Sequence, residues 1–174
     1  MNREILFRGQ TRKRGEKVNM AGEPIDGNWV YGGIFQGSDD FSIIYGSSEP
    51  DNITADNLAK YVVYTDTVGQ YTGLTDTKKH KAFGDDIVCY KGTHTVYGII
   101  RYGEIHDREG RLNHIGYYIE WQNDGANMWG DWWRSDLGYW LTEPNCEICS
   151  NVHDNPELIG GEDDDKAGES DTGV

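Results

Sequence analysis

Short apolar segments alternate with polar, glycine-containing segments along the whole chain. In residues 28–35, aromatic and β-branched side chains are interleaved with small ones, and residues 41–45 repeat the pattern after a polar turn. Such side chains favour the pleated surface of a strand. The two segments therefore predict an antiparallel hairpin, and shorter apolar segments at residues 4–8 and 61–64 predict two more strands.

The second half of the chain has a more regular pattern. It predicts five strands, at residues 87–90, 96–102, 115–121, 139–142 and 147–152. Short strands with turns at this spacing are typical of a small barrel or roll. In the first half, Thr54 or Asp56 would cap one or two turns of helix before Lys60. The pattern predicts a mainly β fold.

Residues 67–88 lie between the two halves and contain the closely spaced Gly69 and Gly73. Glycine weakens a strand, so a pair of glycines indicates bends or close backbone approach. We expect an irregular loop that leads into the first strand of the second half. The chain then divides into an N-terminal β segment (residues 1–75), a β-roll (76–160) and a tail (161–174). The tail is charged and almost free of apolar residues, which predicts disorder.

Four sequence blocks resemble the YopX family of phage and prophage proteins. The family's signature is similar to Thr67-Val68-Gly69-Gln70-Tyr71-Thr72-Gly73-Leu74. Blocks at residues 3–9 and 28–32 precede it and a block at residues 151–158 comes after it, which is the family's order. The chain departs at Gly84-Asp85-Asp86, where the family usually has Glu-Gly-Asp. The resemblance implies an SH3-like roll for residues 76–160 and no established enzymatic activity. It also implies structural roles for the residues that carry the signatures: Gly69, Gln70, Tyr71, Gly73, Asp86, Asn155 and Pro156.

The chain is strongly acidic. Its formal net charge is −14, of which the tail, with six acidic residues and Lys166, carries −5 and the remainder −9. Such a chain is repelled by nucleic acid and by anionic lipid at long range, so we expect neither as a partner. Residues 10–17 are basic, but the segment is short and contains Glu16, which favours a solvated loop.

The sequence also predicts where the protein is found. No apolar run approaches the roughly 20 residues of a transmembrane helix, and the start Met1-Asn2-Arg3-Glu4 is not typical of a signal peptide. Three cysteines, an odd number, fit a reducing compartment better than a disulfide framework. Together with the resemblance, this predicts a soluble protein in the cytoplasm of a bacterial host.

Five aromatic residues form the first candidate site: Trp129, Trp132, Trp133, Tyr139 and Trp140. Residues 129–134 hold too many rings for all of them to be buried on one strand face. An exposed aromatic platform would bind a peptide, a sugar or a base. Alternatively, the rings cover the open end of the roll or fill a subunit interface, because aromatic residues dominate cores and interfaces.

Cys146 and Cys149, with His153 four residues later, have the spacing of half a zinc site. A structural zinc site needs four ligands, usually from two such pairs, and only the distant Cys89 remains. Buried strand cysteines are therefore the favoured interpretation, with no metal and no cofactor.

The chain lacks the usual catalytic patterns. The acidic residues Asp76, Asp85, Asp86 and Glu104 are scattered, and the sequence has neither a nucleophile motif nor a phosphate-binding loop. We expect a non-enzymatic module that binds an unidentified protein partner or assembles into a homo-oligomer. The alternative is an acidic inhibitor that mimics nucleic acid and blocks a host protein, a role for which the charge of −9 outside the tail would suit it.

Overall fold

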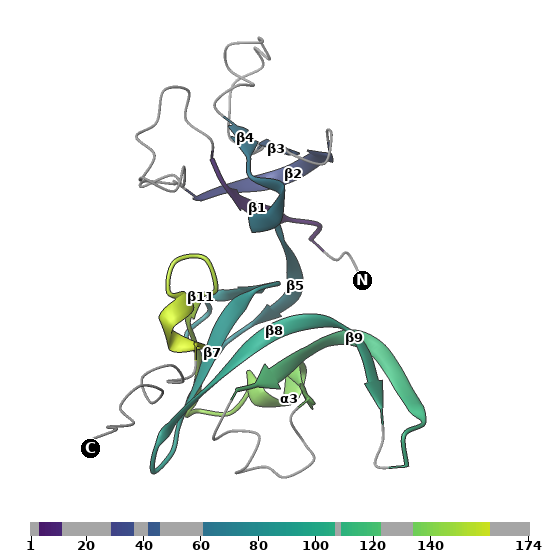
Figure 1. The fold of residues 1–174 in the computed structure, drawn as a ribbon, viewed down its shortest axis with the longest axis vertical. Helices are drawn as coiled ribbons and strands as arrows, with labels where there is room; N and C mark the ends of the chain where they lie inside the picture. The colour runs from purple at the N-terminus through teal and green to yellow at the C-terminus, as the bar shows by residue number, and fades with distance from the viewer. Residues whose placement is uncertain are drawn as a thin grey trace, which may run out of the picture.

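The computed structural model of the chain describes residues 4–11, 29–36, 42–45, 61–106, 109–122 and 134–160. These residues form two antiparallel sheets, which confirms the predicted mainly β fold. Figure 1 shows strands β1–β4 at one end of the molecule and the second sheet at the other, with β5 running between them. The predicted helix at residues 54–60 and the predicted disordered tail lie outside the described residues.

The first sheet has six strands in the order β4-β3-β2-β1-β5-β6. Their bounds are β1 Phe7–Gln10, β2 Trp29–Gln36, β3 Ser42–Tyr45, β4 Val62–Val63, β5 Gly69–Thr75 and β6 Lys81–Phe83. The predicted hairpin is confirmed, because β2 pairs with β3 and Ile34 lies opposite Ile44. The first strand is inserted between later ones, so that Phe7 lies opposite both Gly32 and Gln70.

The second sheet has five strands in the order β10-β9-β8-β7-β11. Their bounds are β7 Asp86–Lys91, β8 Thr95–His106, β9 Leu112–Trp121, β10 Arg134–Asp136 and β11 Cys146–Asn151. Neither sheet closes on itself within the described residues, so the predicted SH3-like barrel is not confirmed. The change of sheet falls between β6 and β7.

The main core lies against the second sheet and the short helix α3 (Leu137–Trp140). Apolar side chains at alternate positions of a strand point to the same face. In β8 and β9 these positions supply buried residues that pack with Leu137 and Leu141. The core cluster comprises Ala82, Val88, Val96, Ile100, Ile119, Trp121, Leu137, Leu141 and Cys146.

Two local predictions were wrong. Residues 139–142 are not a strand, because the Asp136 carboxylate accepts a hydrogen bond from the Tyr139 N–H (2.7 Å) and so caps α3. The expected irregular loop contains strands β5 and β6. Gly73, with a positive φ of 88°, lies where the pairing of these strands shifts register, between Tyr71 and Thr75.

Two 3₁₀ turns complete the described structure: η2 (Thr65–Thr67), before β5, and η3 (Pro156–Leu158), near the end of the described residues. No helix in the described part of the chain is both long and apolar enough to cross a membrane.

Candidate functional site

The two sheets meet at an ion pair between Arg8 of β1 and Asp86 of β7. Arg8 lies opposite Gly69 of β5, and its side chain extends to the start of the second sheet. Its Nη1 is 2.5 Å from Oδ1 of Asp86, and the two side chains are only 8% and 2% exposed. We call this ion pair and the residues around it the junction: Arg8, Trp29, Gly69, Phe83, Gly84 and Asp86.

Aromatic rings and a carbonyl group enclose the Arg8 guanidinium. Its central carbon lies 4.8 Å from the ring centre of Trp29 and 5.0 Å from that of Phe83. Its Nη2 donates a hydrogen bond to the Gly84 carbonyl oxygen at 3.3 Å. A cation desolvated against aromatic faces is attracted by the ring quadrupoles. The junction therefore holds a positive charge that has little contact with water.

Asp86 joins the ion pair to the turn between β6 and β7. Its Oδ2 accepts a hydrogen bond from the Phe83 N–H at 2.7 Å. Burial raises the pKa of Asp86 to about 6, although the Arg8 charge and the Phe83 N–H both act to lower it. The cost of desolvating this carboxylate therefore exceeds what its partners return, as is common for buried ion pairs.

Gly69 is required because the turn passes close to its Cα. A Cβ at this position would lie 2.6 Å from the Gly84 carbonyl oxygen and 3.4 Å from Nε of Arg8. The Gly84 N–H in turn donates to the Gln70 carbonyl at 3.0 Å. Backbone contact between β5 and the turn thus leaves no space for a side chain.

Gln70 and Tyr71, which follow in β5, also contact both parts of the molecule. The Tyr117 hydroxyl of β9 donates to Oε1 of Gln70 at 3.4 Å. The Tyr71 N–H donates to the Leu6 carbonyl at 2.8 Å, and the Tyr71 ring lies 5.5 Å from that of Phe83. The signature residues of β5 therefore contact the second sheet through Gln70 and the segment before β1 through Tyr71.

The segment after β11 connects back to the first sheet. Oδ1 of Asn151 accepts hydrogen bonds from the N–H groups of His153 (3.0 Å) and Asp154 (2.9 Å), which fixes a tight turn. The Asp154 carboxylate then accepts from Nε2 of Gln10 (3.0 Å) and from the indole N–H of Trp29 (2.9 Å). Sequence blocks from both ends of the chain therefore meet at the junction.

Asn155 and Pro156 shape the end of this segment. Oδ1 of Asn155 accepts a hydrogen bond from the Ser150 hydroxyl at 2.6 Å. Pro156 begins η3, a position where its missing N–H costs nothing. Both residues keep the closing segment close to the end of β11.

The YopX protein family model matches residues 28–160, which is more than half of the chain. The chain belongs to the YopX family. Comparison with curated proteins gives no match. In this YopX-family chain, the blocks at residues 28–32, 67–74 and 151–158 all contribute to the junction or its immediate contacts. The opening block, which supplies Arg8, precedes the matched residues.

An open groove of about 760 Å³ lies beside the junction of this YopX-family chain. Arg8, Tyr31 and Phe83 line it on one side, and Ile148, Cys149 and Asn151 of the β11 strand line it on the other. The groove lies between β6, an edge strand of the first sheet, and β11, an edge strand of the second. It gives solvent access to the Cys149 side chain, which is exposed.

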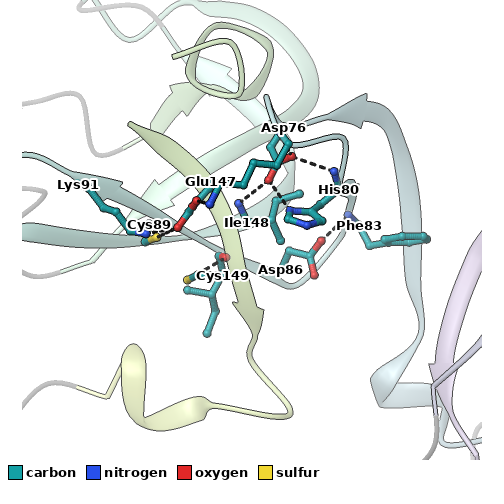
Figure 2. A network of polar contacts seen from close by, with 11 residues as sticks. Asp76, His80, Phe83, Asp86, Cys89, Lys91, Glu147, Ile148 and Cys149 are labelled. Atoms are coloured by element: carbon teal, nitrogen blue, oxygen red, sulfur yellow. Dashed lines mark hydrogen bonds and ion pairs between the residues drawn. The ribbon is translucent and has the colours of Figure 1, made fainter. Parts of the chain in front are cut away.

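Asp76 forms a second buried polar centre, between the loop before β6 and the middle of β11 (Figure 2). Its Oδ1 accepts from the N–H groups of Lys78 and His80 (both 2.9 Å), and its Oδ2 accepts from the Ile148 N–H (3.2 Å). Burial alone would raise the pKa of Asp76, but the hydrogen bonds from His80 and Ile148 bring it below its usual value. This carboxylate stabilises a loop.

The partners of these two acidic residues could not be predicted from the sequence. Asp76 and Asp86 appeared scattered along the chain, whereas each is almost fully buried and accepts backbone hydrogen bonds. One signal was available: Arg8 is a charged residue at the end of a short apolar segment. Within the described residues, no group of three or more His, Cys, Asp or Glu side chains is placed to hold a metal ion.

The aromatic candidates divide into two groups. Trp129, Trp132 and Trp133 lie outside the described residues. Tyr139 and Trp140 belong to α3, where Tyr139 is 60% exposed and Trp140 is half-buried. The Trp140 ring packs edge-on against Trp121 (5.1 Å between ring centres) and Tyr90 (5.4 Å). Trp140 is therefore part of the core, and Tyr139 is the exposed member of the pair.

A different apolar surface is exposed on the long hairpin of β8 and β9. Ile100 lies opposite Ile119, and both are fully buried in the core. The next pairs on the same face are Tyr102 with Tyr117 and then Glu104 with Ile115. Here the core ends, since Tyr102 is 66% and Ile115 56% exposed.

A register shift after Ile105 places Leu112 opposite His106, and so on this same face. Leu112 is 51% exposed. We call Tyr102, Leu112 and Ile115 the hairpin stripe. In Figure 1 the ends of β8 and β9 curve away from the rest of the molecule, which leaves this part of the sheet projecting. The hairpin stripe continues the core face beyond the residues that cover it.

Proposed function

We propose that this YopX-family chain is a non-enzymatic module that binds protein, and that it assembles with further copies of itself through the hairpin stripe. The continuation of the buried core face into exposed Tyr102, Ile115 and Leu112 carries the proposal. Contiguous apolar surface on a projecting element is typical of protein interfaces. A phage origin, a cytoplasmic location and an SH3-like character of the second sheet are parts of the same proposal.

The charge of the hairpin supports a second copy as the occupant. Residues 101–117 contain three arginines and three acidic residues, so this part of the chain is neutral while the whole carries −14. Two copies that met elsewhere would bring acidic surfaces together, at an electrostatic cost. Two hairpins packed about a two-fold axis would bury the apolar residues without adding like charge.

Substitution of the hairpin stripe tests this proposal. We expect Ile115→Thr combined with Leu112→Thr to weaken self-association by at least about tenfold, which corresponds to about 1.4 kcal/mol. Phe35→Thr is the matched control, because Phe35 is 69% exposed on β2, away from the hairpin. Equal dimer dissociation constants for the hairpin variant and the unaltered chain, from size-exclusion chromatography with light scattering, would refute the role of the stripe.

The alternative is the acidic inhibitor that mimics nucleic acid. The net charge of −14 favours it, and it makes an opposite prediction about salt. Binding of a basic host protein through charge would weaken steeply as ionic strength rises, whereas binding through the apolar stripe would persist.

A further inference from the structure

The three cysteines are not arranged as their spacing in the sequence indicates. Cys146 is fully buried in the core cluster, whereas Cys149 is exposed. The third, Cys89 of β7, is 2% exposed and lies directly opposite Glu147 of β11. The closely spaced pair in the sequence is thus divided between the core and the surface.

A β-bulge brings Cys149 to Cys89 instead. Ile148 lies opposite Val88 and Ser150 lies opposite Ile87, so Cys149 is the extra residue of β11 between them. Glu147, which lies opposite Cys89, is two residues before Cys149 on β11, so Cys149 lies diagonally across from Cys89, and its Sγ is 3.4 Å from the Ile87 carbonyl oxygen. Figure 2 shows both cysteines on these neighbouring strands.

The surroundings of the pair favour a thiolate on one of the two sulfurs. The hydrogen bond from Cys149 lowers the pKa of Cys89 to about 7, with smaller help from the Lys91 and Lys78 charges. The same hydrogen bond raises the pKa of Cys149. The two groups therefore lose their first proton as one unit near neutral pH. Burial raises the pKa of Cys146 to about 12, which leaves that thiol protonated and unreactive.

Glu147 holds the two lysines beside this pair. Its carboxylate forms ion pairs with both Lys78 and Lys91 (Figure 2). The Cys89 sulfur lies 4.0 Å from the same carboxylate, at Oε1. The thiol pair is thus part of a charged cluster that spans the loop before β6, β7 and β11.

We propose that Cys89 and Cys149 form a dithiol site that reacts with small disulfides, such as oxidised glutathione, and closes to a disulfide between β7 and β11. The inference concerns a separate part of the molecule from the hairpin stripe and does not depend on the proposed function. Cys149 is the entry point, because it is exposed and lines the groove.

The reaction is a pair of thiol–disulfide exchanges. At neutral pH the pair holds one proton, which rests on Cys149 beside the Cys89 thiolate. Only Cys149 is exposed, so this proton passes to Cys89 as the Cys149 sulfur attacks one sulfur of the small disulfide, whose S–S bond breaks and releases one thiolate. Cys89 then loses its proton and attacks Sγ of Cys149, which breaks the mixed disulfide and releases the second thiolate. Both cysteines are oxidised, two electrons pass to the small disulfide, and the two protons end on two small thiols.

The disulfide would fix the strand that leads to the closing segment. β11 ends at Asn151, whose turn presents Asp154 to Gln10 and Trp29. A covalent link between β7 and β11 would limit fraying of this strand, so we expect the oxidised chain to have a higher midpoint of thermal unfolding.

Peptide mapping of the full chain tests the proposal. The protein is incubated with oxidised glutathione, free thiols are blocked with iodoacetamide, and the digest is analysed by mass spectrometry. We expect a peptide linked through Cys89 and Cys149 as the main product, and its loss on addition of dithiothreitol. A link between Cys146 and Cys149, a lasting glutathione adduct on Cys149 with Cys89 free, or no reaction would each overturn the proposal.

Three variants separate the roles of the sulfurs. Cys149→Ser should abolish reaction with glutathione, because Cys89 is buried. Cys89→Ser should leave a stable glutathione adduct on Cys149, since no second thiol can displace it. The control Cys146→Ala should keep the link between Cys89 and Cys149. A Cys146→Ala chain that no longer forms this link would contradict the assignment.

Discussion

Arg8 of β1 and Asp86 of β7 form an ion pair, with 2.5 Å between Nη1 and Oδ1, that joins the two sheets in a site almost closed to water. Arg8 and Asp86 are the first and last junction residues in the sequence, and among the described ion pairs neither has a second partner of opposite charge. Burying both charges costs free energy, but removing one of them leaves the other without compensation. This asymmetry makes the junction a sensitive point of the fold.

Removal of the Arg8 charge should destabilise the protein strongly. We expect Arg8→Met to lower the free energy of unfolding by about 3–5 kcal/mol, because Asp86 would remain buried without its partner. Urea denaturation followed by tryptophan fluorescence measures the change. Arg111→Met is the control, since its ion pair with Glu109 is largely exposed and should matter by less than about 1 kcal/mol.

The double variant Arg8→Met/Asp86→Leu tests whether the loss of stability in Arg8→Met comes from the unpaired charge of Asp86. Replacing both charges by apolar groups removes the uncompensated charge, so the double variant should be more stable than Arg8→Met alone. If the two substitutions were simply additive in urea denaturation, the ion pair would not be the source of the effect.

Gly69 should be intolerant of a side chain. Its Cβ would lie 2.6 Å from a backbone oxygen of Gly84, which cannot move without disturbing the turn between β6 and β7. We expect Gly69→Ala to cost about 1–3 kcal/mol in thermal or urea unfolding. At Gly33 of β2 the nearest atom to a Cβ is 4.0 Å away, so Gly33→Ala should be neutral or slightly stabilising. Equal effects at the two positions would argue against the close approach.

The junction should also respond to pH. Burial raises the pKa of Asp86 from 3.8 to about 6, so proton uptake by this group favours the folded state. Its stabilising contribution is complete below the unfolded value and is lost as the pH rises through 6.

The Asp86→Asn variant supplies the reference for this effect. Between about pH 7 and about pH 5, we expect the free energy of unfolding of the unaltered chain to increase by about 1 kcal/mol relative to Asp86→Asn. The comparison removes contributions from groups that titrate alike in both proteins. A constant difference across this range would show that Asp86 titrates at an ordinary pKa.

The regular strands could be predicted because their information is local. Alternating apolar residues in 28–35 and 41–45 correctly gave the β2–β3 hairpin, and most of the second sheet followed in the same way. The segment that contains Gly69 and Gly73 was wrongly predicted as a loop, because glycine lowers strand propensity. At Gly69, however, close packing of β5 against the turn between β6 and β7 requires a glycine. At α3, capping by Asp136 outweighed the strand preference of the aromatic residues.

The sites were harder to predict because they depend on contacts between distant parts of the chain. The resemblance singled out Gly69, Gln70 and Asp86, but not the pairing of Asp86 with Arg8. Spacing alone paired Cys146 with Cys149, whereas the register around the bulge in β11 places Cys149 diagonally across from Cys89. The hairpin stripe was missed because its residues are apolar like those of the core, and only exposure distinguishes them.

The concentration dependence of the sedimenting mass tests self-association most directly. A single chain has a mass of 19.7 kDa, and sedimentation velocity of the unaltered protein over a wide concentration range measures how many chains travel together. We predict a mass that rises with concentration towards a multiple of this value and persists at high salt, because apolar contact holds the copies together. A mass that stays at one chain at every concentration would contradict the proposed assembly.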